Sequence, residues 1–260
     1  MTMKDLSAYL DGPFREIEGW CDPWLWQVLA PLRAAQEALG VGGPAAEIGV
    51  HHGKLLIGLI KTSGVARGHL AIDAFDLQAF NLDHSGQGDL AALQGNLARC
   101  GIAPESVRIE RGDSLRLSLR DVDRLRGEAS AGFSFVSVDG CHEVEYALAD
   151  MRLAMELAMP EGIILVDDFL ALHWPGVTEA VARLYLHDRP RFVPLLAGYN
   201  KLLLCHRSHH GAFFKMLVGH INEHLPGRAE AKIVRLFGHR AITIVPDRSL
   251  PFDPAAGAPA

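Results

Sequence analysis

The feature that most constrains the fold of this chain is a repeated alternation of short apolar runs with longer amphipathic segments. Short apolar runs bounded by turn residues are typical of buried β-strands, and apolar residues spaced three or four apart are typical of helices. Strands that alternate with helices form a mostly parallel sheet with helices on both faces. We therefore predict a doubly wound α/β fold.

The predicted strands cover residues 45–50, 69–74, 107–111, 133–138, 162–166, 192–196, 201–205 and 241–245. The predicted helices cover residues 55–61, 89–99, 144–159 and 177–186. We expect Pro160-Glu161-Gly162 to end the helix at 144–159 and to separate it from the next strand. Gly198-Tyr199-Asn200 predicts a hairpin, and therefore an antiparallel pair at the edge of the sheet.

The 260 residues are enough for one α/β domain with additions. Four regions are predicted: a helical segment at 1–44, a sheet-forming core at 45–207, a helix-and-strand extension at 208–246 and a disordered, Pro- and Ala-rich tail at 247–260. Trp20, Trp24 and Trp26 lie in the first region. They either pack over the core or belong to a lid or a dimer contact.

Charge and composition narrow the classes of partner. The net charge of -6 argues against nucleic acid as the main partner, because phosphate contacts need a basic surface. No apolar run reaches the roughly 18 residues of a membrane-spanning helix, and the first residues do not resemble a signal peptide. The 4 cysteines form no CxxC pair, so we expect free thiols and a cytoplasmic protein.

The end of the first predicted strand is a candidate ligand-binding turn, because ligands of open α/β sheets bind beyond the carboxyl ends of the strands. The strand runs from Glu47 into Gly49 and Gly53, and glycines at such a turn let the backbone approach a ligand. His51 and His52 occupy positions that the dinucleotide fingerprint GxGxxG would need. A pyrophosphate cradle is therefore disfavoured.

Two further strand ends carry polar residues that suit a nucleoside. Asp73 ends the second strand, where a carboxylate can accept both hydroxyls of a ribose, and a solvated strand-end carboxylate is the alternative. Asp113 and Ser114 follow the third strand, and capping of the next turn competes with recognition of an adenine amino group. The candidate cofactor residues are thus Glu47, Gly49, Gly53, Asp73, Asp113 and Ser114.

Acids also follow the fourth and fifth predicted strands. Asp139 comes after the fourth, with His142 three residues on, and Asp167 and Asp168 come after the fifth. Neighbouring parallel strands lie about 4.8 Å apart, so these carboxylates should converge and repel unless a cation neutralises them. Oxygen ligands favour a hard divalent ion such as Mg²⁺. Acids held by Arg, Lys or helix N-termini are the alternative.

These motifs together, over about residues 45–207, resemble those of class I S-adenosylmethionine-dependent methyltransferases, which have a Rossmann-like sheet. The acids after strands four and five resemble metal-dependent O-methyltransferases, both the catechol type and the type that acts on sugars of natural products. The resemblance implies S-adenosylmethionine and Mg²⁺ as cofactors, with Asp139, Asp167 and Asp168 as metal ligands. The lysine base of the catechol type is replaced here by His142.

The resemblance implies methylation of a hydroxylated small molecule, with a sugar or secondary metabolite preferred over a phenol. A metal would acidify the acceptor hydroxyl, His142 would remove its proton, and Asp139 would contact the substrate as well as the metal. Such enzymes often associate, which leaves a homo-oligomer open. The competing hypotheses are a metal-independent methyltransferase, a nicotinamide-dependent oxidoreductase or epimerase, and a non-catalytic binding module.

One loop and one turn have less certain roles. Residues 75–89 resemble a loop of uncharacterised methyltransferases of glycan and secondary-metabolite pathways, and the loop is either a lid or polar surface. Residues 173–176 either form a wall of the substrate pocket or lead into the next helix.

Overall fold

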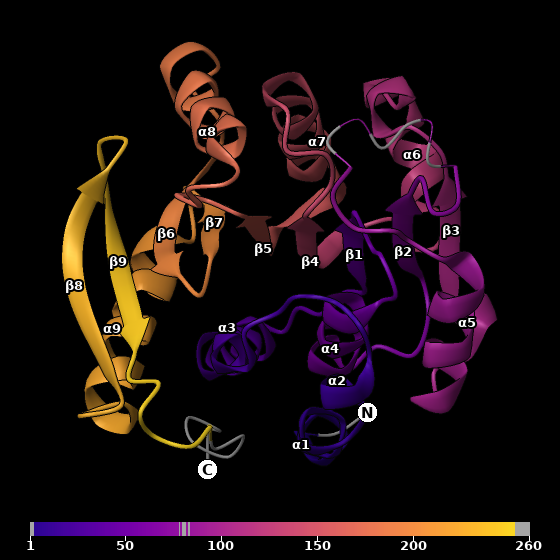
Figure 1. Cartoon of the computed structure of the whole chain (residues 1–260). Helices are drawn as coiled ribbons and strands as arrows, with labels where there is room; N and C mark the ends of the chain where they lie inside the picture. The colour runs from indigo at the N-terminus through magenta and orange to yellow at the C-terminus, as the bar shows by residue number, and fades with distance from the viewer. Residues whose placement is uncertain (1–2, 78, 80–81, 83, 253–260) are drawn as a thin grey trace.

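The computed structural model describes residues 3–77, 79, 82 and 84–252. It contains one sheet of 9 strands, with helices on both of its faces (Figure 1). The strands are β1 Ala45–Ile48, β2 His69–Asp73, β3 Val107–Arg111, β4 Phe133–Val138, β5 Ala158–Asp167, β6 Phe192–Gly198, β7 Lys201–His206, β8 Ala229–Leu236 and β9 His239–Pro246. The α/β class and the mostly parallel sheet are as predicted.

The helices divide between two hydrophobic clusters, one on each face of the sheet. The helices of the first face are α1 Met3–Asp11, α2 Pro13–Glu16, α3 Trp26–Ala38, α4 Lys54–Ser63, α5 Leu90–Arg99 and α9 His210–His224. Those of the second face are α6 Val122–Arg126, α7 Val144–Leu157 and α8 Pro175–His187. Among the described residues, no helix has the length and apolar character that a bilayer crossing requires.

The strand order is β3-β2-β1-β4-β5-β7-β6-β9-β8. The first five strands in this order are parallel, β7 is antiparallel to both β5 and β6, and β9 is parallel to β6. The order reverses between β1 and β4, so a crevice forms beyond their carboxyl ends. The predicted hairpin is present, with Tyr199 and Asn200 at positive φ of 57° and 62°, as a two-residue turn of this type requires.

The predicted stop signal after α7 was wrong. The helix ends at Leu157 and β5 begins at Ala158, so Pro160 and Gly162 lie inside the strand. The pairing of β4 with β5 shifts register between Phe133 and Phe135, and this irregularity accommodates the proline and the glycine. Residues 160–162, which were predicted to be a turn, therefore form an irregular part of β5.

Strand β8 was not predicted from the sequence. It forms the outer edge of the sheet, and most of its residues are exposed. It includes the charged residues Glu230, Lys232 and Arg235, so it lacks the apolar run that indicates a buried strand. Edge strands commonly carry such charges, which oppose pairing with another chain.

The N-terminal helices pack onto α4. Trp26 is 3% exposed and its indole Nε1 donates a hydrogen bond to Thr62 Oγ1 at 2.9 Å. Trp24 is also buried and contacts Phe252, whereas Trp20 is 75% exposed. Trp24 and Trp26 therefore pack in the core, as one of the two predictions had it, whereas Trp20 lies at the surface. Disorder was predicted for residues 247–260. In the described part of this tail Arg248 pairs with Asp22 and Phe252 contacts Trp24, and residues 253–260 lie outside the described residues.

Candidate active site

A cavity of about 530 Å³ opens at the carboxyl ends of the central strands. Its walls come from the ends of β1, β2, β4 and β5, from the segment around Trp20 and from the β6–β7 hairpin. Eight of the predicted site residues line it: Gly49, Asp73, Asp113, Ser114, Asp139, His142, Asp167 and Asp168. Glu47 and Gly53 do not.

The turn after β1 is possible only with glycine at position 49. Gly49 has a φ of +81°, and a Cβ atom there would lie 1.8 Å from the backbone oxygen of Asp139. The backbone of β1 and the start of the β4 loop therefore touch at this point, as the hydrogen bond from Asp139 N to Ile48 O at 2.7 Å also shows. A close approach of this kind leaves the turn open to a ligand on the cavity side.

Asp73 holds this turn in place. Its Oδ2 accepts hydrogen bonds from the backbone N–H groups of Val50 and His51 at 2.6 and 2.8 Å, and its Oδ1 accepts one from Phe75 at 2.5 Å. Of the roughly four acceptor positions on a carboxylate, three are therefore used. The carboxylate predicted to bind a ribose shapes the cofactor turn in this structure.

Asp113 caps the short 3₁₀ turn Ser114–Arg116 through a hydrogen bond from Leu115 N to its Oδ1 at 3.0 Å. Capping was the competing role, and both Asp113 and Ser114 still line the cavity. Nearby, burial and the charge of Asp113 raise the pKa of Asp150, a residue of α7, to about 7. Asp150 packs behind Gly140 and was missed because one acid in an amphipathic helix usually faces solvent.

The structure gives Glu47 and Gly53 other positions. Glu47 is 2% exposed inside β1, and burial raises its pKa to about 8 despite the nearby charge of Lys201. Gly53 precedes α4 with a φ of +85°, and a Cβ atom there would lie 2.5 Å from Leu93 of α5. Neither residue lines the cavity, and their contact with a cofactor stays a prediction.

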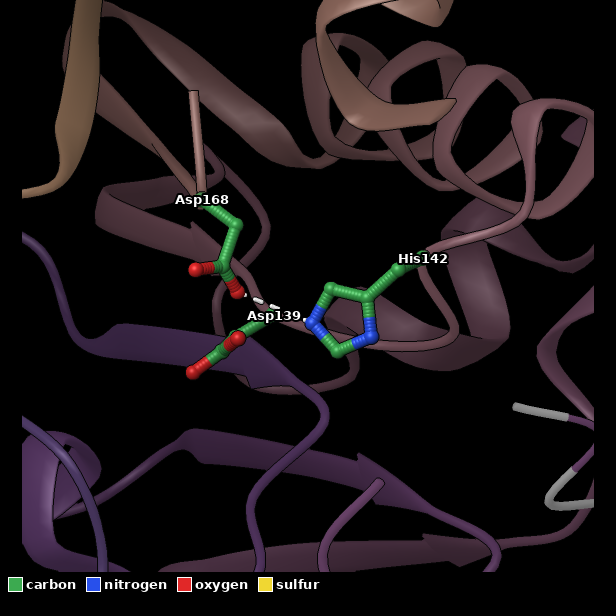
Figure 2. Close-up of side chains that lie close together, drawn as sticks. All are labelled: Asp139, His142 and Asp168. Carbon is green, nitrogen blue, oxygen red and sulfur yellow. Dashed lines mark hydrogen bonds and ion pairs between the residues drawn. The ribbon is translucent and has the colours of Figure 1, made fainter. Parts of the chain in front are cut away.

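Asp139, His142 and Asp168 form a cluster in the cavity (Figure 2). One potential ligand atom from each lies within 4.8 Å of the others. His142 Nε2 is 2.9 Å from Asp168 Oδ2, and the imidazole stacks on Trp174 with ring centroids 4.1 Å apart. This part of the predicted convergence is present, and Trp174 of the 173–176 turn lines the cavity beside it.

The electrostatics of the cluster follow from burial and crowding. Burial, followed by the charge of Asp167, raises the pKa of Asp139 well above its ordinary value. Burial would raise the pKa of Asp168 too, but hydrogen bonds from His142 and Asn200 outweigh it and leave that pKa lowered. Asp168 also has a left-handed φ of 56°, a backbone strain of the kind found at functional sites.

Asp167 is held differently from the other two acids. Its Oδ2 forms an ion pair with the ammonium group of Lys201, and its Oδ1 accepts hydrogen bonds from Asp168 N at 2.9 Å and Asn200 Nδ2 at 3.2 Å. The predicted ligands were Asp139, Asp167 and Asp168, and the geometric cluster contains His142 in place of Asp167. The assignment of metal ligands stays a prediction. An acid held by a lysine was the alternative considered for this position.

Sequence reasoning missed Asn200 and Lys201, which line the cavity from the β6–β7 hairpin. The hairpin itself was predicted, but its predicted place at the edge of the sheet was wrong, because β9 and β8 extend the sheet beyond β6. Strand β7 lies beside β5 with Lys201 opposite Asp167, although β6 precedes it in the chain. The only sequence signal for these two site residues was the polar pair formed by Asn200, the last residue of the predicted turn, and Lys201 after it.

Comparison with known proteins agrees with this geometry. Residues 46–169, just under half of the chain, match the family model of a methyltransferase domain. None of the curated proteins matches the chain.

Similar solved structures include the O-methyltransferase NovP, at 15% identity and a TM-score of 0.54, covering 70% of this chain and 78% of that one. Cofactor-bound Rv0187 from MTB has 17% identity and a TM-score of 0.51, covering 76% and 88%. CalS11, a TDP-rhamnose 3′-O-methyltransferase of calicheamicin biosynthesis, has 16% identity and a TM-score of 0.51, covering 78% and 92%. At these identities the likeness establishes a shared fold.

Proposed function

We propose that this chain, whose residues 46–169 form a methyltransferase domain of the S-adenosylmethionine-dependent class, methylates a hydroxyl group of a small molecule with the help of a divalent cation. The observation that carries the proposal is the cluster of Asp139, His142 and Asp168 beside the glycine turn, in one cavity. A methyl donor and a hydroxyl activated by the cluster would then meet in that cavity.

The cofactor half of the cavity is proposed to be the side formed by the β1 turn and the β3 loop. Gly49 gives a close backbone approach, and Asp73 keeps the N–H groups of the turn ordered. Asp113 and Ser114 line the same cavity and could contact the adenine ring. Glu47 would act only indirectly, since it lies beneath the turn.

The donor set of the cluster fits a hard divalent cation such as Mg²⁺. Asp139 and Asp168 offer carboxylate oxygens on one side of the cavity, and crowding with Asp167 disfavours the charged form of Asp139 unless a cation is present. We therefore propose Asp139 and Asp168 as ligands. When bound, such an ion lowers the pKa of an acceptor hydroxyl by Lewis-acid polarisation.

His142 is proposed as the general base. Its Nε2 faces the two carboxylates (Figure 2). The hydrogen bond to Asp168 and the stacked ring of Trp174 fix the plane of the imidazole. An imidazole can accept a proton from a hydroxyl group as a general base. The acceptor oxygen would then attack the sulfonium methyl group in line, and a water-poor cavity favours the accompanying cancellation of charge.

The acceptor is proposed to be a sugar or a secondary metabolite that carries a hydroxyl group. NovP and CalS11 support this choice by their fold, and CalS11 acts on TDP-rhamnose. The acidic overall charge supports a small-molecule acceptor in place of nucleic acid, and a cytoplasmic location is part of the same proposal. A homo-oligomer is part of the same proposal.

A metal-independent methyltransferase is the second candidate, and the ion pair between Lys201 and Asp167 favours it. With one acid already neutralised by a lysine, His142 and Asp168 could act as a base and its orienting partner without a metal. The two candidates differ in their response to chelation.

Both candidates are tested by incubating the protein with methyl-labelled S-adenosylmethionine and a panel of sugar, sugar-nucleotide and phenolic acceptors, with EDTA and then with added Mg²⁺. Transfer that disappears with EDTA and returns with Mg²⁺ would support the cation-assisted reaction. Transfer that is indifferent to EDTA would favour the second candidate, and labelling of a nitrogen in place of an oxygen would overturn the proposal.

A further inference from the structure

A buried lysine lies at the base of the acidic cluster. Lys201 is 2% exposed, begins β7 and is placed opposite the last residue of β5. Its ammonium group is ion-paired with Asp167 and lies near enough to Asp139 to interact with its carboxyl group electrostatically. A buried ammonium group needs such a partner, because the energy of desolvation is large.

The carboxylate of Asp167 has little capacity left for another ligand. Lys201, Asn200 and the backbone of Asp168 already supply three donors to it, and its side chain is only 8% exposed. A metal ion that bound Asp167 would have to displace Lys201 and leave its charge buried without a counter-ion.

Asp139 and Asp168 differ from Asp167 in this respect. Asp168 accepts hydrogen bonds from His142 and Asn200, both of which line the cavity, and its side chain is 16% exposed. Asp139 and Asp168 also approach one another closely enough to share an ion with His142 nearby. All three acids line the cavity, and Asp167 is the one that forms an ion pair with Lys201.

We infer that the ammonium group of Lys201 is a fixed positive charge within the acidic cluster and has Asp167 as its counter-ion. Asp139 and Asp168 therefore remain to bind one divalent ion. The inference rests on the proposed function, since it concerns the proposed cation site. It assigns a positioning role to a hairpin outside the matched residues 46–169. It also explains how the acids can stay together when no divalent ion is bound.

The test is a titration of Mn²⁺, followed by electron paramagnetic resonance, on the full chain and four variants. Asp168→Asn should weaken Mn²⁺ binding by about 100-fold, because a direct ligand is lost. The double variant Asp167→Asn/Lys201→Met removes both partners of the ion pair and should bind Mn²⁺ within about threefold of the unmodified chain. Lys201→Met alone frees Asp167, so Mn²⁺ should bind at least about tenfold more tightly.

Lys201→Arg is the matched control, since it keeps the charge, and its Mn²⁺ affinity should stay close to that of the unmodified chain. If Lys201→Met alone does not fold, the Mn²⁺ affinity of the double variant still shows whether Asp167 is a ligand of the ion. The inference is overturned if the double variant loses as much affinity as Asp168→Asn, or if neither Lys201→Met nor the unmodified chain binds Mn²⁺. S-adenosylhomocysteine binding and methyl transfer, measured on the same samples, show separately whether the proposed function fails.

Discussion

At the scale of single residues, His142 is the group on which the proposed chemistry depends most. Its Nε2 bonds to Asp168 and its ring rests on Trp174, so its orientation is set by two neighbours. Removal of a positioned general base typically costs about 10²- to 10⁴-fold in rate. We predict a loss of kcat in this range for His142→Gln, measured by methyl transfer.

The same variant distinguishes a base from a metal ligand. If His142 is the base, His142→Gln should bind S-adenosylhomocysteine and Mn²⁺ as the unmodified chain does, as calorimetry can measure. A loss of Mn²⁺ binding would make the imidazole a ligand of the ion, and an unchanged kcat would remove it from the mechanism.

His69, outside the cavity, should make stability depend on pH. It lies in β2 fully buried, with its Nδ1 accepting from Ala45 N at 3.1 Å, and burial lowers its pKa from 6.5 to about 4. The unfolded chain therefore binds this proton first as the pH falls. The stability due to neutral His69 is complete above about pH 6.5 and is lost between pH 6.5 and 4.

The expected loss is on the order of 3 kcal/mol in the free energy of unfolding. His69→Gln keeps an acceptor for Ala45 N but cannot titrate. Urea unfolding at several pH values should give a steeper fall between pH 6.5 and 4 for the unmodified chain than for the variant. Parallel curves for the two proteins would show that His69 is not the group responsible.

At the scale of elements, the turn after β1 should tolerate no side chain at position 49. Gly49→Ala combines a positive φ with a clash against the backbone of Asp139. We expect loss of S-adenosylhomocysteine binding together with a destabilisation above about 2 kcal/mol. Gly95→Ala is the control, because position 95 lies inside α5 with free space around it, and this change should stabilise by about 0.5–1 kcal/mol. Equal effects of the two changes would contradict the account of the turn.

Substitution of two tryptophans should show whether the N-terminal segment only packs on the core or also acts as a lid over the cavity. Trp24 is 5% exposed, so Trp24→Ala should cost about 3–5 kcal/mol of stability. Trp20 is exposed, lines the cavity and has its ring centroid 5.6 Å from that of His51. Trp20→Ala should leave stability within about 0.5 kcal/mol but weaken ligand binding, and the reverse pattern in thermal unfolding and calorimetry would rule out the lid.

How far the sequence predicts each element depends on its surroundings. β4 has the predicted bounds, because all of its residues are buried and a strand pairs with it on each side. The start of β5 was missed because a bulge places Pro160 in a strand, and β8 was missed because it is exposed at an edge. Local pattern thus succeeds where burial is uniform.

At the scale of the whole molecule, the proximity of the acids could be predicted where it depends only on adjacent parallel strands. Asp139 and Asp168 converge because β4 and β5 pair in register, as strand adjacency implied. The ion pair of Asp167 with Lys201 could not be predicted, because Lys201 lies on a strand that is distant in the chain. The position of β7 between β5 and β6 depends on long-range strand pairing, which no local sequence motif specifies.

The C-terminal region shows the same dependence on long-range pairing. Its strand β9 joins the sheet beside β6, and Arg248 beyond it pairs with Asp22, whose backbone borders the cavity. Residues 208–246, predicted as an extension, therefore complete the sheet on which the site is built.

The central claim is that the acids of two neighbouring strands hold a divalent cation beside the methyl donor. The most direct measurement is the NMR linewidth of the S-methyl protons of S-adenosylmethionine bound to the protein, with and without Mn²⁺. The account predicts strong paramagnetic broadening in the unmodified chain and little in Asp139→Asn or Asp168→Asn. Tight binding of both ligands without broadening, or equal broadening in those variants, would contradict it.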